Sequence, residues 1–175
     1  MNRFLVVVDM QNDFIDGSLG TAEARGILPS VIETVKSFCG RVVFTRDTHR
    51  ANYLESREGK ALPVEHCIEG TDGWQIQSEL EALRVNIGAP VINKPTFGSV
   101  ELPALVAKAA DGDDFSVELI GLCTDICVVS NTLLLKAHFP ETEISVDASC
   151  CAGVTPATHA AALTTMEMCQ IRVTR

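Results

Sequence analysis

The chain has 175 residues, of which 46% are hydrophobic, and its formal net charge is −9. This length and composition suit one folded domain, expected over residues 1–175. The negative charge argues against a nucleic-acid partner and against an anionic membrane surface. No stretch reaches the roughly 18 continuous apolar residues that a membrane-spanning helix requires. The seven cysteines are odd in number and scattered, so we expect reduced thiols and a cytoplasmic protein rather than a disulfide-bonded secreted one.

Short β-branched runs alternate with longer helical patterns along the chain. Strands are expected at 4–8, 41–46, 90–93, 115–121, 144–146 and 171–173. Helices are expected at 27–38, 77–83, 102–110, 124–138 and 156–168. This alternation is typical of an α/β fold in which helices cover both faces of a mostly parallel sheet of about six strands. The sequence therefore predicts a three-layer α/β/α architecture.

The first expected strand ends at Asp9. A carboxylate at the carboxyl end of a buried strand is costly unless it has a partner or a task, so Asp9 is a candidate functional residue as well as a candidate loop cap. Phe14 follows shortly after, and it either packs in the core or forms the wall of a pocket.

The second expected strand runs into Asp47 and His49, which are two residues apart and point to the same face of an extended backbone. Glu58 and His66 come next in a polar stretch. Carboxylate oxygens and imidazole nitrogens suit a divalent ion such as Zn²⁺, Fe²⁺ or Mn²⁺. The alternative is a polar loop whose histidines are satisfied by hydrogen bonds.

Lys94 follows the third expected strand, with Phe97 in the loop after it, and either a surface lysine or a site lysine fits that pattern. After the fourth strand, Thr124 is expected to cap a helix that carries Cys127 in its first turn. Cysteines at helix N-termini can have pKa values lowered to roughly 3.5–7.5, although free cysteines are also often inert and buried.

Asp9, Lys94 and Cys127 thus follow three expected parallel strands, whose carboxyl ends share one edge of the sheet. An acid, a cation and a thiol at one edge form a coherent catalytic set. The carboxylate can take the thiol proton, and the ammonium group can stabilise both the carboxylate and the thiolate.

These residues resemble the motifs of the isochorismatase-like cysteine hydrolases, whose best-known members are nicotinamidases. Val-Val-Asp9-Met-Gln-Asn-Asp-Phe14 resembles the opening motif of the family, and Gly121-Leu-Cys-Thr-Asp-Ile-Cys127-Val resembles its nucleophile motif. The stretches around Asp47 and His66 are similar to its metal-site motifs, and Lys94 matches its lysine. The resemblance covers nearly the whole chain.

The resemblance implies an isochorismatase-like fold of Rossmann-like topology, a triad of Asp9, Lys94 and Cys127, and a cis peptide between Leu122 and Cys123. It also implies an oxyanion hole made by the backbone N–H groups of Cys123 and Cys127, and one divalent metal ion, with Zn²⁺ preferred over Fe²⁺ or Mn²⁺. The implied ligands are Asp47, His49, Glu58 and His66, and the implied pocket residues are Phe14 and Phe97.

The resemblance further implies hydrolysis of a small amide, foremost nicotinamide to nicotinate and ammonia, by an enzyme that is often a homo-oligomer. Carbamoyl or ureido amides and isochorismate are the alternatives within the family. A thiol redox protein and a non-catalytic interaction protein are alternatives from other classes. Two features depart from nicotinamidases: no aromatic residue shortly precedes His66, and Cys150 and Cys151 lie where the pocket is expected.

Overall fold

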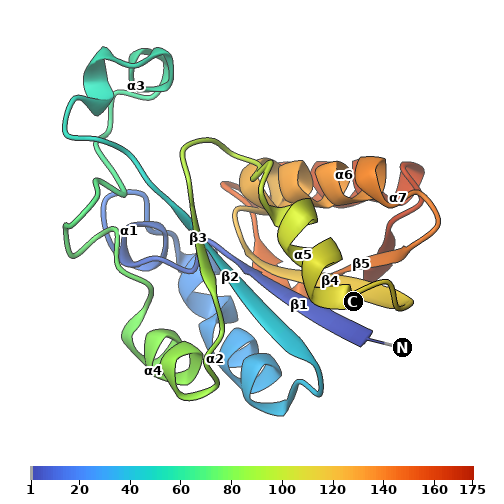
Figure 1. The fold of residues 1–175 in the computed structure, drawn as a ribbon. Coiled ribbons are helices and arrows are strands. Elements are labelled where there is room, and N and C mark those ends of the chain that lie inside the picture. The colour runs from blue at the N-terminus through green and yellow to red at the C-terminus, as the bar shows by residue number, and fades with distance from the viewer. Residues whose placement is uncertain (1) are drawn as a thin grey trace.

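A computed structural model describes residues 2–175 and contains one parallel sheet in the strand order β3-β2-β1-β4-β5-β6 (Figure 1). The strands are β1 (Asn2–Val8), β2 (Arg41–Asp47), β3 (Val91–Lys94), β4 (Phe115–Leu122), β5 (Glu143–Ala152) and β6 (Arg172–Thr174). This confirms the six-stranded parallel sheet. The order reverses between β1 and β4, and open α/β sheets bind ligands at the carboxyl ends of the strands beside such a switch point.

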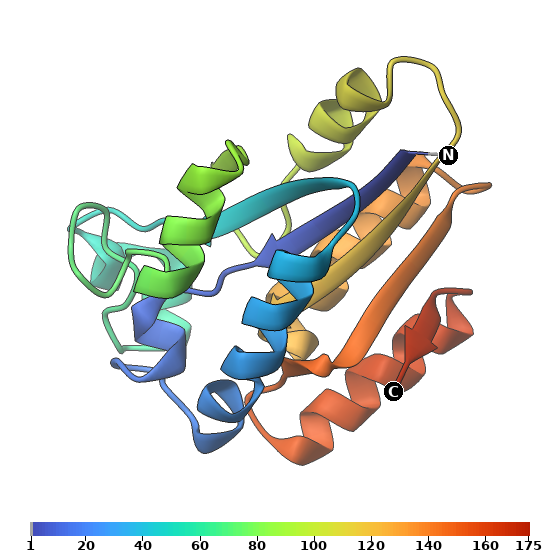
Figure 2. The same cartoon turned by 90° about the horizontal axis from the view of Figure 1, so that it is seen from below.

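Helices cover both faces of the sheet, as Figure 2 shows from below. The helices are α1 (Asn12–Ile15), α2 (Ala22–Ser37), α3 (Arg57–Ala61), α4 (Ser78–Asn86), α5 (Leu102–Ala110), α6 (Val129–His138) and α7 (Pro156–Met168). A 3₁₀ turn, η1 (Tyr53–Glu55), precedes α3, and a π-helical turn, η2 (Thr124–Val128), leads into α6. The buried clusters place α1, α2 and α4 on one face and α5, α6 and α7 on the other.

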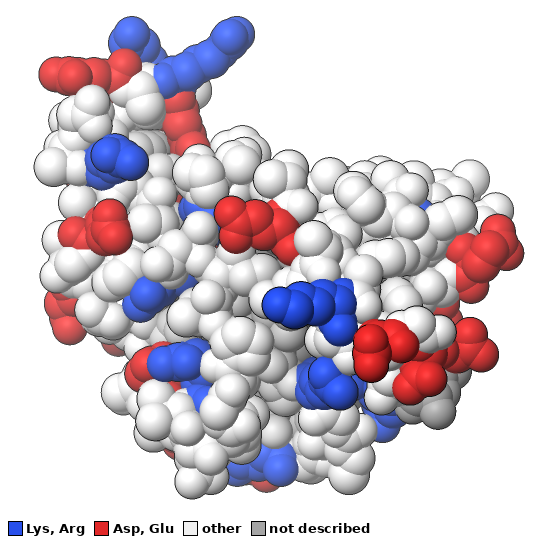
Figure 3. Space-filling model, viewed as in Figure 1, with Lys and Arg blue, Asp and Glu red and all other residues white. Residues whose placement is uncertain are grey.

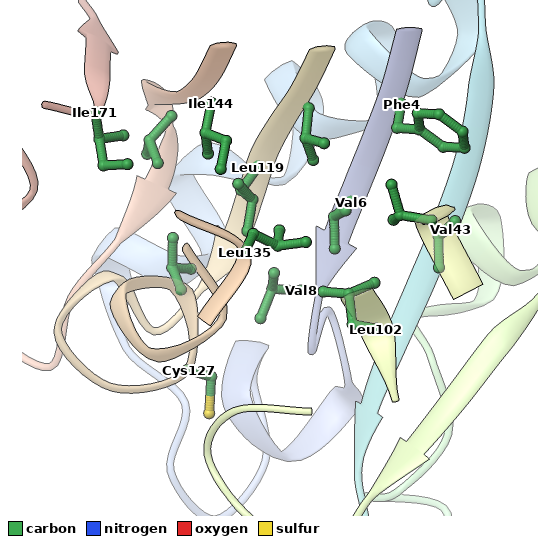
Figure 4. Packing of buried hydrophobic residues seen from close by; sticks show 14 of the residues in the cluster. Phe4, Val6, Val8, Val43, Leu102, Leu119, Cys127, Leu135, Ile144 and Ile171 are labelled. Atoms are coloured by element: carbon green, nitrogen blue, oxygen red, sulfur yellow. The ribbon is translucent and has the colours of Figure 1, made fainter. Parts of the chain in front are cut away.

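Side chains of β1 alternate between the two cores because successive residues of a strand point to opposite faces. Phe4, Val6 and Val8 pack toward α5, α6 and α7, whereas Leu5 and Val7 pack toward α1, α2 and α4. Figure 4 shows the first of these clusters, with labelled side chains from strands such as β1 and β4, from α5 and α6, and from the π-helical turn that holds Cys127. A strand that is buried on both faces reads as a continuous apolar run, as β1 does.

Several expected boundaries were wrong. Helix α2 begins at Ala22 instead of residue 27, because Thr21 caps it and the helix continues through Pro29. Strand β5 runs on to Ala152, where its last residues pair with the end of β4 after an irregularity in register. Helices α1 and α3 were not expected, since segments of four and five residues are too short to show a helical period.

The segment that carries η1 and α3 projects from the body of the protein at the upper left of Figure 1. Acidic and basic side chains intermingle over the face shown in Figure 3, including on this projecting segment. Among residues 2–175, no helix has the length and apolar character to cross a membrane.

Candidate active site

Asp9 lies at the carboxyl end of β1, where the backbone leaves the sheet. Its φ of 47° is in the left-handed region, which aspartate tolerates better than most residues. The side chain is fully buried, and its two oxygens have different partners. Oδ1 accepts a hydrogen bond of 2.7 Å from the Thr45 hydroxyl, and Oδ2 lies 2.6 Å from Lys94 Nζ. The carboxylate is therefore held in one orientation.

Lys94 is the last residue of β3 and is also buried. Its Nζ donates to Asp47 Oδ1 at 3.2 Å and to Cys127 Sγ at 3.3 Å, in addition to pairing with Asp9. Burial alone would lower the pKa of this lysine, but the charges of Asp9 and Asp47 raise its pKa above the ordinary value. The ammonium group therefore stays protonated and contacts both a carboxylate and the thiol.

Cys127 is the fourth residue of η2, just after β4, and is almost fully buried. Figure 4 shows it at the end of the apolar cluster, with its sulfur pointing away from the packed side chains. The close approach of β4 to β1 depends on Gly121, where a Cβ would collide with the Val8 carbonyl oxygen. The peptide bond between Leu122 and Cys123 is cis.

Two expectations about this helix start were wrong. The N-cap position is Cys123, and no side chain caps it. The Thr124 hydroxyl instead lies 2.8 Å from His159 Nδ1 on α7, because the π-helical turn directs it toward that helix. The carboxylate of the next residue, Asp125, accepts hydrogen bonds from the Val154 N–H at 3.1 and 3.2 Å. These contacts fix η2 against the β5–α7 connection.

The pKa of Cys127 is raised well above its usual value, first by burial and then by the negative charge of Asp9, and Lys94 lowers it only in part. The expectation of a thiolate with a lowered pKa is therefore wrong, because desolvation outweighs the helix N-terminus. The pKa of Asp9 is likewise raised, chiefly by burial. The resting site accordingly holds a neutral thiol next to a base.

Asp47, His49, Glu58 and His66 form a compact group, with one ligand atom from each lying within 4.8 Å of the others. Asp47 Oδ2 lies 3.0 Å from His49 Nε2, and Glu58 Oε1 lies 3.7 Å from the same nitrogen. Glu58 reaches the group from the projecting helix α3, so the irregular spacing in the sequence does not keep it away.

The orientation of the two histidines suits a metal ion. His66 Nδ1 lies 2.8 Å from the Val64 carbonyl oxygen, so this nitrogen carries the proton and Nε2 is left as a ligand. His49 Nε2 is buried and makes no hydrogen bond despite the nearby Asp47 oxygen. His49 Nε2 lies 3.0 and 3.7 Å, and His66 Nε2 3.8 and 3.9 Å, from Asp47 Oδ2 and Glu58 Oε1, so both nitrogens adjoin the same two carboxylate oxygens. Two imidazoles and two carboxylates fit a borderline divalent ion such as Zn²⁺.

The backbone of Asp47 is clamped by the buried side chain of Gln11. Gln11 Oε1 accepts the Asp47 N–H at 2.7 Å, and Gln11 Nε2 donates to the Asp47 carbonyl at 2.8 Å and to the Trp74 carbonyl at 2.9 Å. Gln11 was not among the residues expected at the site, although it stands within the opening motif. The only signal was a polar residue directly after a buried strand.

A cavity of about 380 Å³ opens beside Cys127. It contains the expected pocket residues Phe14 and Phe97 and three of the four expected metal ligands. Most of its other lining residues were not singled out from the sequence: Leu19, Thr21, Ala24, Ala61, Leu62, Leu122, Ile126, Gly153 and Val154. They come from α2, α3, β4, η2 and the connections that follow α1, α3 and β5, which no sequence pattern brings together.

Cys150 and Cys151 do not line this cavity, contrary to the expectation. As neighbours on β5 they point to opposite faces, so Cys150 packs in one core and Cys151 in the other. Trp74 also lies outside the cavity, where its indole donates to the Thr48 hydroxyl and Arg46 stacks on its ring. Ala61 and Leu62 form the wall just before His66.

Comparison with known proteins places this geometry in a family. The family model described as the isochorismatase domain matches residues 3–175. A nicotinamidase/pyrazinamidase from Mycobacterium tuberculosis is 27% identical over 98% of this chain and 97% of its own. The crystal structure of Pyrococcus horikoshii pyrazinamidase in complex with zinc is 25% identical, with a TM-score of 0.78 over 100% of this chain and 99% of that chain.

The crystal structure of N-carbamoylsarcosine amidase from Thermoplasma acidophilum is 28% identical, with a TM-score of 0.76 over 100% of this chain and 96% of that chain. These relatives are named for different substrates, and each aligns with this chain over nearly the whole length of both. With the family model matching nearly every residue, the chain is a hydrolase of the isochorismatase family.

Proposed function

We propose that the protein is a cysteine amidohydrolase that converts nicotinamide and water to nicotinate and ammonia. One observation carries the proposal: Lys94 Nζ lies 2.6 Å from Asp9 and 3.3 Å from Cys127 Sγ, next to an apolar cavity that also reaches the metal group. The relative from M. tuberculosis is named a nicotinamidase/pyrazinamidase, which supports the same assignment.

In the proposed reaction, the Asp9 carboxylate accepts the thiol proton as the Cys127 sulfur attacks the amide carbonyl carbon. The backbone N–H groups of Cys123 and Cys127 stabilise the oxyanion. Lys94 stabilises the negative charge of the Asp9 carboxylate and the charge that develops on the Cys127 sulfur. Asp9 then gives the proton to the departing ammonia, which leaves a thioester on Cys127. Water attacks the thioester with Asp9 as base, and the acid product and the free thiol are released.

Asp47, His49, Glu58 and His66 are proposed as the metal ligands. A divalent ion held there supplies a Lewis-acidic anchor for the ring nitrogen or for a water molecule. The crystal structure of the P. horikoshii relative is a complex with zinc, which supports Zn²⁺ as the first candidate. Phe14 packs at 5.6 Å between ring centroids against His66, so it lies where a substrate ring would approach the metal group.

Hydrolysis of a carbamoyl amino acid is the second candidate, because a relative named N-carbamoylsarcosine amidase is 28% identical. Such substrates carry a carboxylate, as does isochorismate, and a buried carboxylate requires a cationic or hydrogen-bonding partner. The residues that line the cavity include no lysine and no arginine. Away from the proposed metal site, the side chains that line the cavity therefore favour a neutral amide.

Ammonia release from a panel of small amides tests the proposal. We expect release from nicotinamide, weaker or no release from N-carbamoylsarcosine, and none from either with the Cys127→Ala variant. Turnover of N-carbamoylsarcosine alone would replace nicotinamide with a carbamoyl substrate.

We also propose that residues 1–175 act as one domain in a cytoplasmic homo-oligomer. The sheet draws on strands from Asn2 to Thr174, which supports one domain. Leu54, Val100 and Met168 expose 48%, 74% and 80% of their side chains, which suits contact with another copy. Light scattering of the purified protein gives the number of subunits.

A further inference from the structure

The cavity is lined by a second set of residues that belong neither to the metal group nor to the proposed triad. This distal wall consists of Leu19, Thr21, Ala24, Gly153 and Val154. The α1–α2 connection, the first turn of α2 and the β5–α7 connection supply it, whereas α3 supplies Glu58 of the metal group. Cavities of about 300–1,000 Å³ hold drug-sized ligands, so a cavity of about 380 Å³ leaves space beyond a single-ring amide.

The distal wall is uncharged. Its one polar side chain, Thr21, already accepts the Ala24 N–H at 3.0 Å as the cap of α2. The nearest acidic group tied to the wall, Asp125, is engaged by the Val154 N–H. A charged substituent would lose its hydration there without gaining a partner, whereas an apolar substituent would be favoured.

Apolar side chains also surround the cavity mouth. Leu62, Phe97 and Val154 line the cavity yet expose 39%, 42% and 51% of their surface. The backbone of two of them is fixed, because Asn131 Nδ2 donates to the Phe97 carbonyl at 3.3 Å and Asp125 holds Val154. The mouth therefore offers a preformed apolar surface that a larger substrate would cover.

We infer that the site takes neutral aromatic amides carrying an apolar substituent, with the amide at Cys127 and the substituent against the distal wall. This inference rests on the proposed amidohydrolase function. It predicts that such amides are preferred over nicotinamide, which is still hydrolysed, and over amides that carry a carboxylate.

The test compares nicotinamide with nicotinamides that carry a propyl group or a carboxylate on a ring carbon remote from the amide. A methylene group in an apolar pocket changes kcat/KM by about tenfold or more, so we expect at least about a tenfold higher kcat/KM for a propyl amide. Val154→Trp should reduce this propyl-to-nicotinamide ratio about tenfold, because the indole fills the distal wall. Val85→Trp, on exposed α4, is the matched control and should leave the ratio unchanged.

Calorimetry measures the binding of nicotinamide and of the propyl amides to the metal-loaded Cys127→Ala variant. These affinities separate the inference about the distal wall from the proposed function. If nicotinamide is hydrolysed but propyl amides neither react faster nor bind more tightly, the inference is wrong and the proposed function stands. If no amide is hydrolysed but propyl amides bind more tightly and Val154→Trp removes the gain, the distal wall is supported and the proposed function is wrong. Preferred turnover of the carboxylate amide would overturn the inference.

Discussion

Asp47 joins Lys94 to the metal group. Its Oδ1 accepts a hydrogen bond of 3.2 Å from Lys94 Nζ, while its Oδ2 lies 3.0 Å from His49 Nε2. One buried carboxylate is therefore shared between the proposed triad and the proposed metal site. A change on either side alters the charge that the other side experiences.

Removal of the Cys127 thiol tests the proposed nucleophile. Cys127→Ala should lower kcat on nicotinamide by at least about a thousandfold, since loss of a nucleophile leaves only binding and oxyanion stabilisation. Cys123→Ala should retain measurable activity, because position 123 is proposed to act through its backbone N–H. Labelling by an electrophilic amide analogue, located by mass spectrometry, should fall on Cys127. A label on Cys150 or Cys151 in active protein would mean that the nucleophile is wrongly assigned.

Removal of the Lys94 charge tests the electrostatics of the triad. Lys94→Met removes the partner of two buried carboxylates, and breaking such a pair costs about 3–5 kcal/mol of unfolding free energy. It should also raise the pKa of Cys127 further, because the lysine is the cation that opposes the burial effect. Alkylation of Cys127 by iodoacetamide as a function of pH measures this shift. An unchanged alkylation profile in folded protein would exclude a role for Lys94 at the thiol.

The raised pKa of Asp9 determines how enzymatic activity declines at acidic pH. Asp9 must be ionised to accept the thiol proton, and burial holds its pKa above the usual 3.8. Activity should therefore decline with falling pH at a midpoint above 3.8, before an ordinary aspartate is protonated. The profile of kcat/KM on nicotinamide between pH 3 and pH 8 measures it. A midpoint at or below 3.8 would mean that a different group acts as the base.

Removal of one imidazole tests the metal site. We expect one divalent ion per chain in the wild-type protein and at least about a hundredfold weaker affinity in His49→Ala, since ligand loss exceeds the 10–100-fold effect of removing an outer-shell partner. His138→Ala is the matched control, because this histidine is exposed at the end of α6. Elemental analysis, chelation and add-back of metal give the stoichiometry and the affinity. Full activity of metal-free protein would remove the ion from the mechanism.

Gln11 is expected to act as a positioning residue for Asp47. Gln11→Met keeps the side-chain volume but removes three hydrogen bonds, so metal affinity should fall about 10–100-fold, as for other outer-shell partners. Gln77→Met is the control: Gln77 Oε1 accepts the backbone N–H groups of Glu79 and Leu80 at the start of α4, and these side-chain hydrogen bonds do not involve Asp47. Equal metal affinity in the two variants would limit Gln11 to a role in folding.

The sequence alone determined the parallel α/β sheet, because buried strands read as apolar runs and their helices as longer periodic segments. It also identified Asp9, Lys94 and Cys127, since polar residues directly after apolar strands stand out and parallel strands end at one edge. Family motifs added the metal group, which spacing alone leaves ambiguous. Helices α5 and α7 have the expected bounds because Ala-rich periods and Pro156 mark them clearly.

Only the tertiary structure decided the state of the thiol, the cavity and the supporting residues. The pKa of Cys127 depends on burial, which local sequence does not encode, and burial reversed the expectation from its helix position. The distal wall joins residues from the α1–α2 and β5–α7 connections, more than a hundred positions apart, so no local pattern contains it. Gln11, Thr45 and His159 act through hydrogen bonds to distant partners, and such contacts exist only once the strands and helices have packed.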